Sequence, residues 1–210
     1  MDSVDLYCER LDAEFWAEPI NALTNAAFLL AAWGVWRLSR RSSTLSPGVW
    51  LLIATVVAIG IGSFVFHTVA TGWARWLDVL PILIFQLLFL WLYGRQVIAL
   101  TRPTSGLLLV GFLAAAALGR QFPAILNGSL IYAPAFLAIL ALGLYHARIA
   151  ASGRFDLLAA AGLLAVSILF RTMDNAVCSA IPIGTHFLWH LGNGAVVYFA
   201  LRALVHRPLR

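Results

Sequence analysis

Residues 48–69 read GVWLLIATVVAIGIGSFVFHTV, a stretch without Asp, Glu, Lys or Arg whose ionisable residue is His67. At about 1.5 Å per residue, an α-helix of this length crosses the roughly 30 Å of hydrocarbon in a bilayer. The rest of the chain is similar: of its 210 residues 62% are hydrophobic and 11% charged, and the mean hydropathy is +0.90. A water-soluble core of this size cannot bury so much apolar surface, so we predict a polytopic membrane protein.

Windows long enough to cross a bilayer predict an all-α bundle of seven transmembrane helices. They cover residues 20–37, 48–69, 76–94, 105–120, 129–147, 156–178 and 185–204. The fourth window is short and rich in Gly and Ala. Without it, six spans would remain and both termini would lie on the same side of the membrane. Seven spans are favoured because most of the arginines then fall on one side of the membrane, as the positive-inside rule requires.

The basic residues comprise 14 arginines and no lysine. With seven spans, one side of the membrane collects Arg37, Arg40, Arg41, Arg95, Arg102, Arg148, Arg154, Arg202, Arg207 and Arg210. The other side has Arg10, Arg75 and Arg120, and Arg171 lies inside the sixth span, where it must face a polar interior or snorkel outward. The positive-inside rule therefore places the N-terminus outside and the C-terminus in the cytoplasm. The net charge of +5 follows from this asymmetry and does not indicate nucleic-acid binding.

Six of the nine acidic residues lie within the first 18 positions. This segment lacks the positive start and short apolar core of a signal peptide, so we expect residues 1–19 to form an acidic extracytoplasmic segment of the mature protein. Residues 20–204 are expected to form one seven-helix transmembrane domain, followed by a basic cytoplasmic tail at 205–210.

The two cysteines, Cys8 and Cys178, both fall on the predicted outer side, where disulfides persist. A bridge between them would hold the acidic segment over the mouth of the bundle. Spacing alone does not show that their Cα atoms come within bonding range, so two unrelated small apolar residues are the alternative.

Three histidines lie near the ends of predicted helices. His67 is close to the end of the second helix, and His186 and His190, four residues apart, share one face of the seventh. Because successive helices run in opposite directions, these two helix ends lie at the same outer depth. Neutral imidazoles are costly in a bilayer unless something binds them, and three of them with an open fourth position are typical of a catalytic zinc site. The alternative is a set of interfacial or capping histidines.

Further polar residues lie at the same depth: Ser63 one turn before His67, Asp78 at the start of the third helix, and Asp174 in the outer part of the sixth. Zinc would lower the pKa of a bound water and polarise a carbonyl group, so we predict attack of zinc-bound water on an acyl bond. Asp78 is placed to take a proton and return it to a leaving amine, and Ser63 to donate to an oxyanion. Alternatively, Asp78 could be an N-cap, Ser63 a packing residue and Asp174 a partner of Arg171.

The spacing of these residues resembles that of the alkaline ceramidase family and of the wider group of seven-helix membrane hydrolases that includes the adiponectin receptors. The matching positions are Ser63, His67, Asp78, His186 and His190, with Cys8, Glu9, Glu18, Asn21, Asn25, Asp174, Asn175 and Cys178. The resemblance extends from about residue 5 to residue 194. It implies zinc on the three histidines, with Asp78 and Ser63 as catalytic partners. It also implies supporting roles for Asn21, Asn25 and Asp174.

The resemblance further implies a disulfide between Cys8 and Cys178, and it raises the question of a second metal. In the eukaryotic ceramidases an acidic N-terminal segment holds a calcium ion. The corresponding candidates are Asp5, Glu9, Asp12 and Glu18. Arg10 and the loss of an oxygen ligand depart from that pattern and would weaken a site for a hard cation, so a solvated acidic face is the alternative.

Together these features predict a zinc-dependent intramembrane hydrolase acting on linear amide C–N bonds, which releases a fatty acid and an amine from ceramide or another N-acyl lipid. The Arg-only, Ala/Leu-rich composition indicates a GC-rich bacterial genome and an inner-membrane protein with its active site toward the periplasm. A membrane lipid is the expected partner, and no obligate protein partner is evident. The competing prediction is a seven-helix receptor or transporter with a structural zinc ion and a lipid-binding cavity, which would not need the carboxylate of Asp78.

Overall fold

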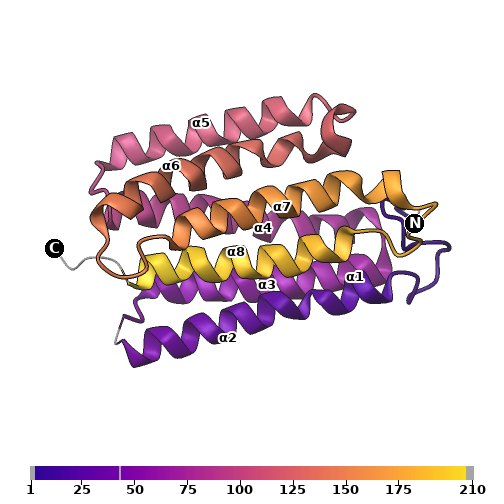
Figure 1. Ribbon diagram of the computed structural model, residues 1–210, viewed down its shortest axis with the longest axis horizontal. Coiled ribbons are helices and arrows are strands. Elements are labelled where there is room, and N and C mark those ends of the chain that lie inside the picture. The colour runs from indigo at the N-terminus through magenta and orange to yellow at the C-terminus, as the bar shows by residue number, and fades with distance from the viewer. Residues whose placement is uncertain (1–2, 43, 207–210) are drawn as a thin grey trace.

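The computed structural model describes residues 3–42 and 44–206 and consists of helices that run along one common axis (Figure 1). The elements are α1 (Pro19–Thr24), α2 (Ala26–Arg41), α3 (Pro47–Val69), α4 (Gly72–Gln96), α5 (Arg102–Arg120), η1 (Ile125–Tyr132), α6 (Ala133–Ile149), α7 (Asp156–Val177) and α8 (His186–Val205). The N-terminal segment lies at the end of the bundle where α8 begins, and α8 ends at the opposite end. Of the predicted basic tail, residues 207–210 lie outside the described part.

The predicted all-α membrane bundle is confirmed. Six helical stretches are long and apolar enough to cross a membrane: α3, α4, α5, η1 with α6, α7 and α8. The first predicted span is divided at Asn25 into α1 and the 16-residue α2. The Asn25 backbone is itself in the right-handed helical region, with φ −63° and ψ −16°, and the two pieces lie in line (Figure 1). Together α1 and α2 therefore correspond to the first predicted span, which brings the number of spans to seven. The short fourth span, rich in Gly and Ala, is present as α5.

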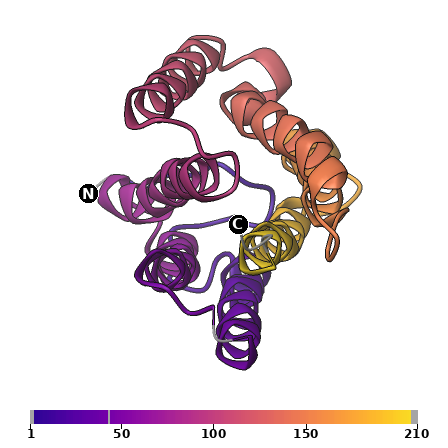
Figure 2. The same cartoon turned by 90° about the vertical axis from the view of Figure 1, so that its left-hand side faces the viewer.

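Helices α2, α3 and α8 pack against one another, whereas α5 packs mainly against α4, η1 and α6. This agrees with the end-on view in Figure 2, in which α5 lies apart from α8. In α3 and α8, 56% of the most apolar window is buried within the protein, against 11% in α5. Large apolar side chains of α5 such as Leu107 and Val110 are exposed, which is the arrangement expected of a lipid-facing helix.

The turn between α3 and α4 determines where Asp78 lies. Ala70 ends α3 in the left-handed region, with φ +46°, and the extended Thr71 is the N-cap of α4. The third span therefore starts at Gly72 instead of 76, and Asp78 lies in its second turn. The alternative that Asp78 caps this helix is wrong.

Gly62 allows α3 and α4 to approach closely beside the same turn. A Cβ atom at this position would overlap the backbone carbonyl of Leu77. Only a residue without a side chain fits here without moving one helix, as is common where helices meet in membranes. The contact places Ser63, the next residue of α3, against Asp78 of α4.

Candidate metal centre

The three predicted histidines come together at the end of the bundle that carries the N-terminal segment. His67 lies in the last turn of α3, and His186 and His190 lie in the first two turns of α8. One ring nitrogen from each falls within 4.8 Å of the other two, and all three residues are at most 2% exposed. The three histidines that were predicted to lie at one depth therefore form a cluster.

Two of the rings are held by hydrogen bonds at Nδ1. Glu18 Oε2 lies 2.6 Å from His67 Nδ1, and Thr24 Oγ1 lies 3.0 Å from His190 Nδ1. The Nε2 atom of His67 is buried without a hydrogen-bond partner among the described residues. A histidine oriented by a carboxylate at one nitrogen and left free at the other is the usual arrangement of a metal ligand.

His186 is held from two sides. Its backbone N–H donates to Asp174 Oδ1 at 2.8 Å, and its ring stacks on Tyr7, with ring centroids 3.6 Å apart and planes inclined by 17°. Its Nδ1 is also buried without a partner in the described part of the chain. Unpaired buried nitrogens are costly, so the donor set fits a transition-metal ion. Burial raises the pKa of the Tyr7 hydroxyl, which keeps that hydroxyl protonated.

Glu18 stands at the centre of a buried network behind His67. Arg10 Nε donates to Glu18 Oε1 at 2.6 Å, and Asn21 Nδ2 donates to Oε2 at 3.1 Å. Burial by itself raises the pKa of Glu18, but the hydrogen bonds and charges of His67 and Arg10 outweigh it and lower the pKa overall. Glu18 therefore stays ionised beside the cluster and orients His67, a role that was not predicted from the sequence. Its predicted calcium ligation stays a prediction.

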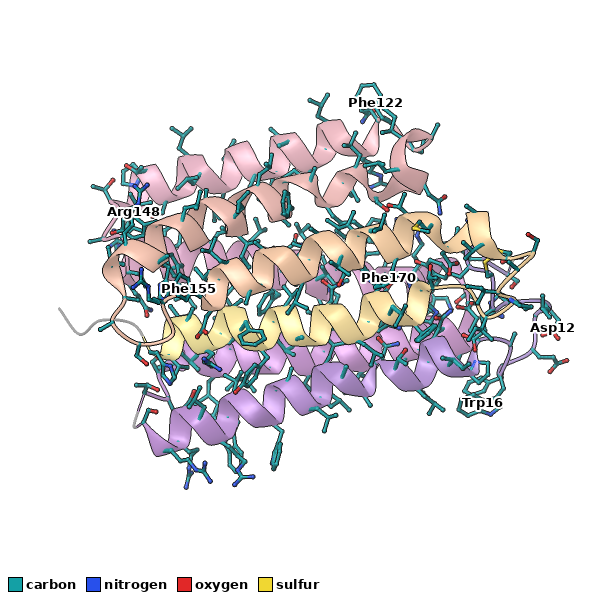
Figure 3. All side chains as sticks on the ribbon, in the orientation of Figure 1. Asp12, Trp16, Phe122, Arg148, Phe155 and Phe170 are labelled. Carbon is teal, nitrogen blue, oxygen red and sulfur yellow. A yellow bond between two sulfur atoms is a disulfide. The ribbon has the colours of Figure 1, made fainter. Side chains whose placement is uncertain are left out.

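The remaining calcium candidates do not converge. Glu9 accepts hydrogen bonds from the backbone N–H groups of Ile20 and Asn21; burial raises its pKa and these bonds partly oppose the rise. Asp5 and Asp12 are exposed, and Asp12 points away from the bundle (Figure 3).

A guanidinium group occupies the space among the oxygens of this segment. Besides Glu18, Arg10 donates through Nη1 to the carbonyl of Asp12 at 3.2 Å and through Nη2 to that of His67 at 3.1 Å. In the described chain, the one group of His, Cys, Asp and Glu residues placed to hold a metal is the histidine cluster. Calcium binding therefore remains a prediction.

Asp174 ties the N-terminal segment to the start of α8. Its carboxylate is fully buried and accepts from the backbone N–H groups of Cys8, Thr185 and His186 at 3.0, 2.6 and 2.8 Å. Cys8 and Cys178 form a disulfide, with Cα atoms 5.2 Å apart, so the predicted bridge is confirmed. The supporting role of Asp174 is thus to position the segment that carries Tyr7.

Asn21 and Asn25 lie in and next to α1 and are buried. Asn21 reaches Glu18 through its side chain, and Asn25 Nδ2 donates to the Asn21 carbonyl at 2.9 Å. Both therefore shape the short helix that carries Thr24.

Asp78 and Ser63 adjoin the cluster at the α3–α4 contact. The Ser63 side chain lies within hydrogen-bonding reach of the Asp78 carboxylate, which also lies within electrostatic reach of His67. Asp78 lines a cavity of about 940 Å³ at this end of the bundle. The carboxylate beside the histidine cluster thus borders a space large enough for a lipid head group.

Several residues around this cavity were not predicted as site residues. Tyr7, Tyr132 and Arg171 line it. Arg171 Nη1 donates to the carbonyl of Asn127 at 3.1 Å and to Ser129 Oγ at 2.7 Å. It makes no ion pair with Asp174, so that alternative is wrong for the described residues. The signal in the sequence was an arginine inside an apolar run, which indeed faces a polar interior.

A second, apolar cavity of about 80 Å³ lies deeper in the bundle. Its walls include Phe85, Phe89 and Phe112 from α4 and α5, and Tyr132 lines both cavities. The polar space near the histidines and the apolar space between the helices therefore share one wall.

These features define a multi-pass membrane protein with a candidate metal centre beside a carboxylate and a cavity. A family model described as Ceramidase matches residues 4–207, and the chain belongs to this family. None of the curated proteins compared with the chain matches it. Membership in the ceramidase family indicates a hydrolase that acts on the amide bond of a lipid.

Proposed function

We propose that this protein is a zinc-dependent intramembrane lipid amide hydrolase that cleaves an N-acyl lipid into a fatty acid and an amine. The observation that carries the proposal is the convergence of three buried imidazoles, two of them with unpaired nitrogens, beside the Ser63–Asp78 pair at the cavity. A purely structural metal would not need a carboxylate at this place.

A zinc ion held by His67, His186 and His190 would supply a water of lowered pKa and polarise the amide carbonyl. The remaining chemistry belongs to side chains of the protein. Asp78 accepts the proton of the attacking water and returns it to the nitrogen of the leaving amine. Ser63 donates its hydroxyl hydrogen to Asp78 in the resting arrangement and so orients the base. Its predicted donation to the oxyanion requires the hydroxyl to turn toward the substrate.

The two cavities support a lipid as the substrate. The polar cavity beside Asp78 suits a head group and the scissile amide, and the apolar cavity lined by Phe85 and Phe89 suits part of an acyl chain. Tyr132, which lines both, lies at the junction between head group and chain. Ceramide and other N-acyl lipids share this division into a polar head and an apolar tail.

The proposal includes an orientation. The acidic segment, the histidines and the disulfide lie at one end of the bundle, and most arginines of the loops lie at the other. We place the first end outside and the second in the cytoplasm, in the inner membrane of a bacterium, because the positive-inside rule and the persistence of disulfides agree on it.

The test measures zinc content and fatty-acid release from a panel of N-acyl lipids with purified protein. Asp78→Asn is expected to retain zinc and to lose about 100-fold or more in rate, because general acid–base catalysis contributes about 10²–10⁴-fold. Glu14→Gln, an exposed change in the N-terminal segment, is the matched control and should leave both unchanged. Wild-type protein that holds zinc but hydrolyses no lipid would favour a receptor or transporter and overturn the proposal.

A further inference from the structure

We infer that the amine part of the substrate carries an anionic group, a carboxylate or a phosphate, which is bound by Arg75, Arg120 and Arg171. This inference rests on the proposed hydrolase function and specifies its substrate class. An N-acyl amino acid or an N-acyl lipid with a phosphorylated head would satisfy it, whereas a neutral ceramide would not.

The three arginines reach one cavity from three different helices. Arg75 lies in the first turn of α4, Arg120 is the last residue of α5, and Arg171 lies in the outer part of α7. All three line the 940 Å³ cavity that also contains Asp78. The sequence separates them by up to 96 positions, so their meeting at this cavity depends on the bundle.

None of these arginines forms an ion pair among the described residues, although the Asp78 carboxylate lies within electrostatic reach of Arg75 and Arg171. The ion pairs within residues 3–42 and 44–206 are Arg10–Glu18, His67–Glu18 and Arg202–Asp156. The acidic residues on the cavity wall are Asp5 and Asp78. Asp78 is the proposed base, and Asp5 is exposed. The wall therefore has an excess of positive charge where a head group would lie.

Arg171 carries the strongest argument because it is half-buried. Its Nη1 donates to neutral oxygens of Asn127 and Ser129, and its guanidinium lies over the ring of Tyr132, 5.3 Å from the centroid. The hydroxyls of Tyr7 and Tyr132 also lie within hydrogen-bonding reach of the guanidinium. A guanidinium has five N–H donors, so at least one remains beyond these four contacts.

The Asp78 carboxylate lies within electrostatic reach of Arg171 but forms no ion pair with it. A half-buried charge that is only partly compensated is costly, and a bound carboxylate or phosphate would supply a close counter-charge.

Phosphates of the surrounding bilayer are the rival partner for Arg75 and Arg120, which are both exposed. The test therefore uses non-ionic micelles without phospholipid. It compares N-acyl amino acids with their methyl esters, and N-acyl ethanolamine phosphates with N-acyl ethanolamines, all with the same acyl chain. The measured quantity is kcat/KM for each pair, with KM and kcat resolved.

Wild-type protein is expected to prefer at least one charged lipid over its neutral partner by about 10- to 100-fold, mainly through KM, since a charge-assisted hydrogen bond has this magnitude. Arg171→Gln and Arg120→Gln should each reduce the preference, and Arg171→Lys should reduce it less. Arg102→Gln, at the other end of α5 and exposed, is the matched control and should keep it.

A second readout does not depend on turnover. The thermal midpoint of Asp78→Asn should rise with the charged lipid more than with its neutral partner. If no lipid is hydrolysed but this difference is present, the hydrolase proposal fails while the anionic site is supported. Equal kcat/KM for charged and neutral lipids overturns the inference and leaves the hydrolase intact. A preference that survives in both Gln variants also overturns it and assigns the arginines to bilayer phosphates.

Discussion

Glu18 Oε2 lies 2.6 Å from His67 Nδ1, and both residues are at most 2% exposed. The contact joins the N-terminal segment to the end of α3. It makes Nδ1 the protonated nitrogen of His67 and leaves Nε2 free toward the other two histidines. One carboxylate thus sets both the tautomer and the orientation of a proposed ligand.

Glu18→Gln is expected to weaken zinc binding by about 10- to 100-fold, the usual effect of removing the group that orients a metal-bound histidine. The amide cannot accept from His67 with the strength of a carboxylate. Competition with a chromogenic chelator measures the affinity. Glu14→Gln removes an exposed charge four residues away and serves as the control. Equal affinities in wild type and Glu18→Gln would show that this contact does not serve the metal.

Arg10→Ala is expected to destabilise the protein by about 3–5 kcal/mol, because it leaves Glu18 as a buried charge without its guanidinium partner. Arg10 is 4% exposed and binds the segment through several oxygens. The thermal midpoint measures the loss, with the exposed Arg41→Ala as control.

Calcium added to the same variants tests the second metal. If the Arg10 guanidinium occupies the position that a calcium ion would otherwise take, calcium should raise the thermal midpoint of Arg10→Ala. It should leave the midpoint of wild type unchanged. Stabilisation of wild type by calcium would instead support the calcium ligands predicted from the sequence.

Substitutions at Thr24 test its hydrogen bond with His190, the third proposed metal ligand. Thr24→Val keeps the shape but removes the hydroxyl that lies 3.0 Å from His190 Nδ1, so zinc affinity should fall, whereas Thr24→Ser should retain most of it. The two variants are compared by metal content after dialysis against chelator. Indistinguishable zinc retention in both would assign Thr24 to its backbone bonds with Ile20 and Asn21 alone.

The Cys8–Cys178 bridge is expected to stabilise the protein by about 2–5 kcal/mol, because it joins segments 170 residues apart in sequence. The double variant Cys8→Ser, Cys178→Ser should have a lower thermal midpoint than wild type. A reductant should lower the midpoint of wild type and leave that of the double variant unchanged. Denatured, unreduced wild type should not react with a thiol reagent, because the chain has two cysteines and the bridge takes up both. Two labelled thiols per chain would contradict the bridge.

Gly62→Ala is expected to cost about 1–3 kcal/mol and to slow hydrolysis, because the added methyl group pushes α3 away from Leu77 and separates Ser63 from Asp78. Gly106→Ala in α5 is the matched control, since a Cβ there meets nothing within 4 Å. Thermal midpoints and lipid turnover compare the two. A Gly62→Ala protein as active and stable as wild type would mean that the helices can separate freely here.

Composition and helix direction were sufficient for the outline of the molecule. Long apolar windows predict membrane helices because the bilayer forces every backbone group to bond within the segment. The alternation of helix direction then places the end of the second span and the start of the seventh at one depth, which is why His67, His186 and His190 could be grouped from the sequence. Boundaries were less accurate: the third span begins at Gly72, after the left-handed turn at Ala70, whose carbonyl accepts a hydrogen bond from the Val4 N–H at 2.7 Å.

The sequence by itself determined the class of protein, the helices and the residues from which a metal centre could be assembled, since apolar length and residue type are local properties. The tertiary structure alone decided how those residues are used. Glu18 is the partner of both His67 and Arg10, which lie 49 and eight positions away in the chain. Arg171 met Arg75 and Arg120 at one cavity because three helices bring them there. Such pairings depend on distances between segments far apart in the chain, and the order of residues does not encode those distances directly.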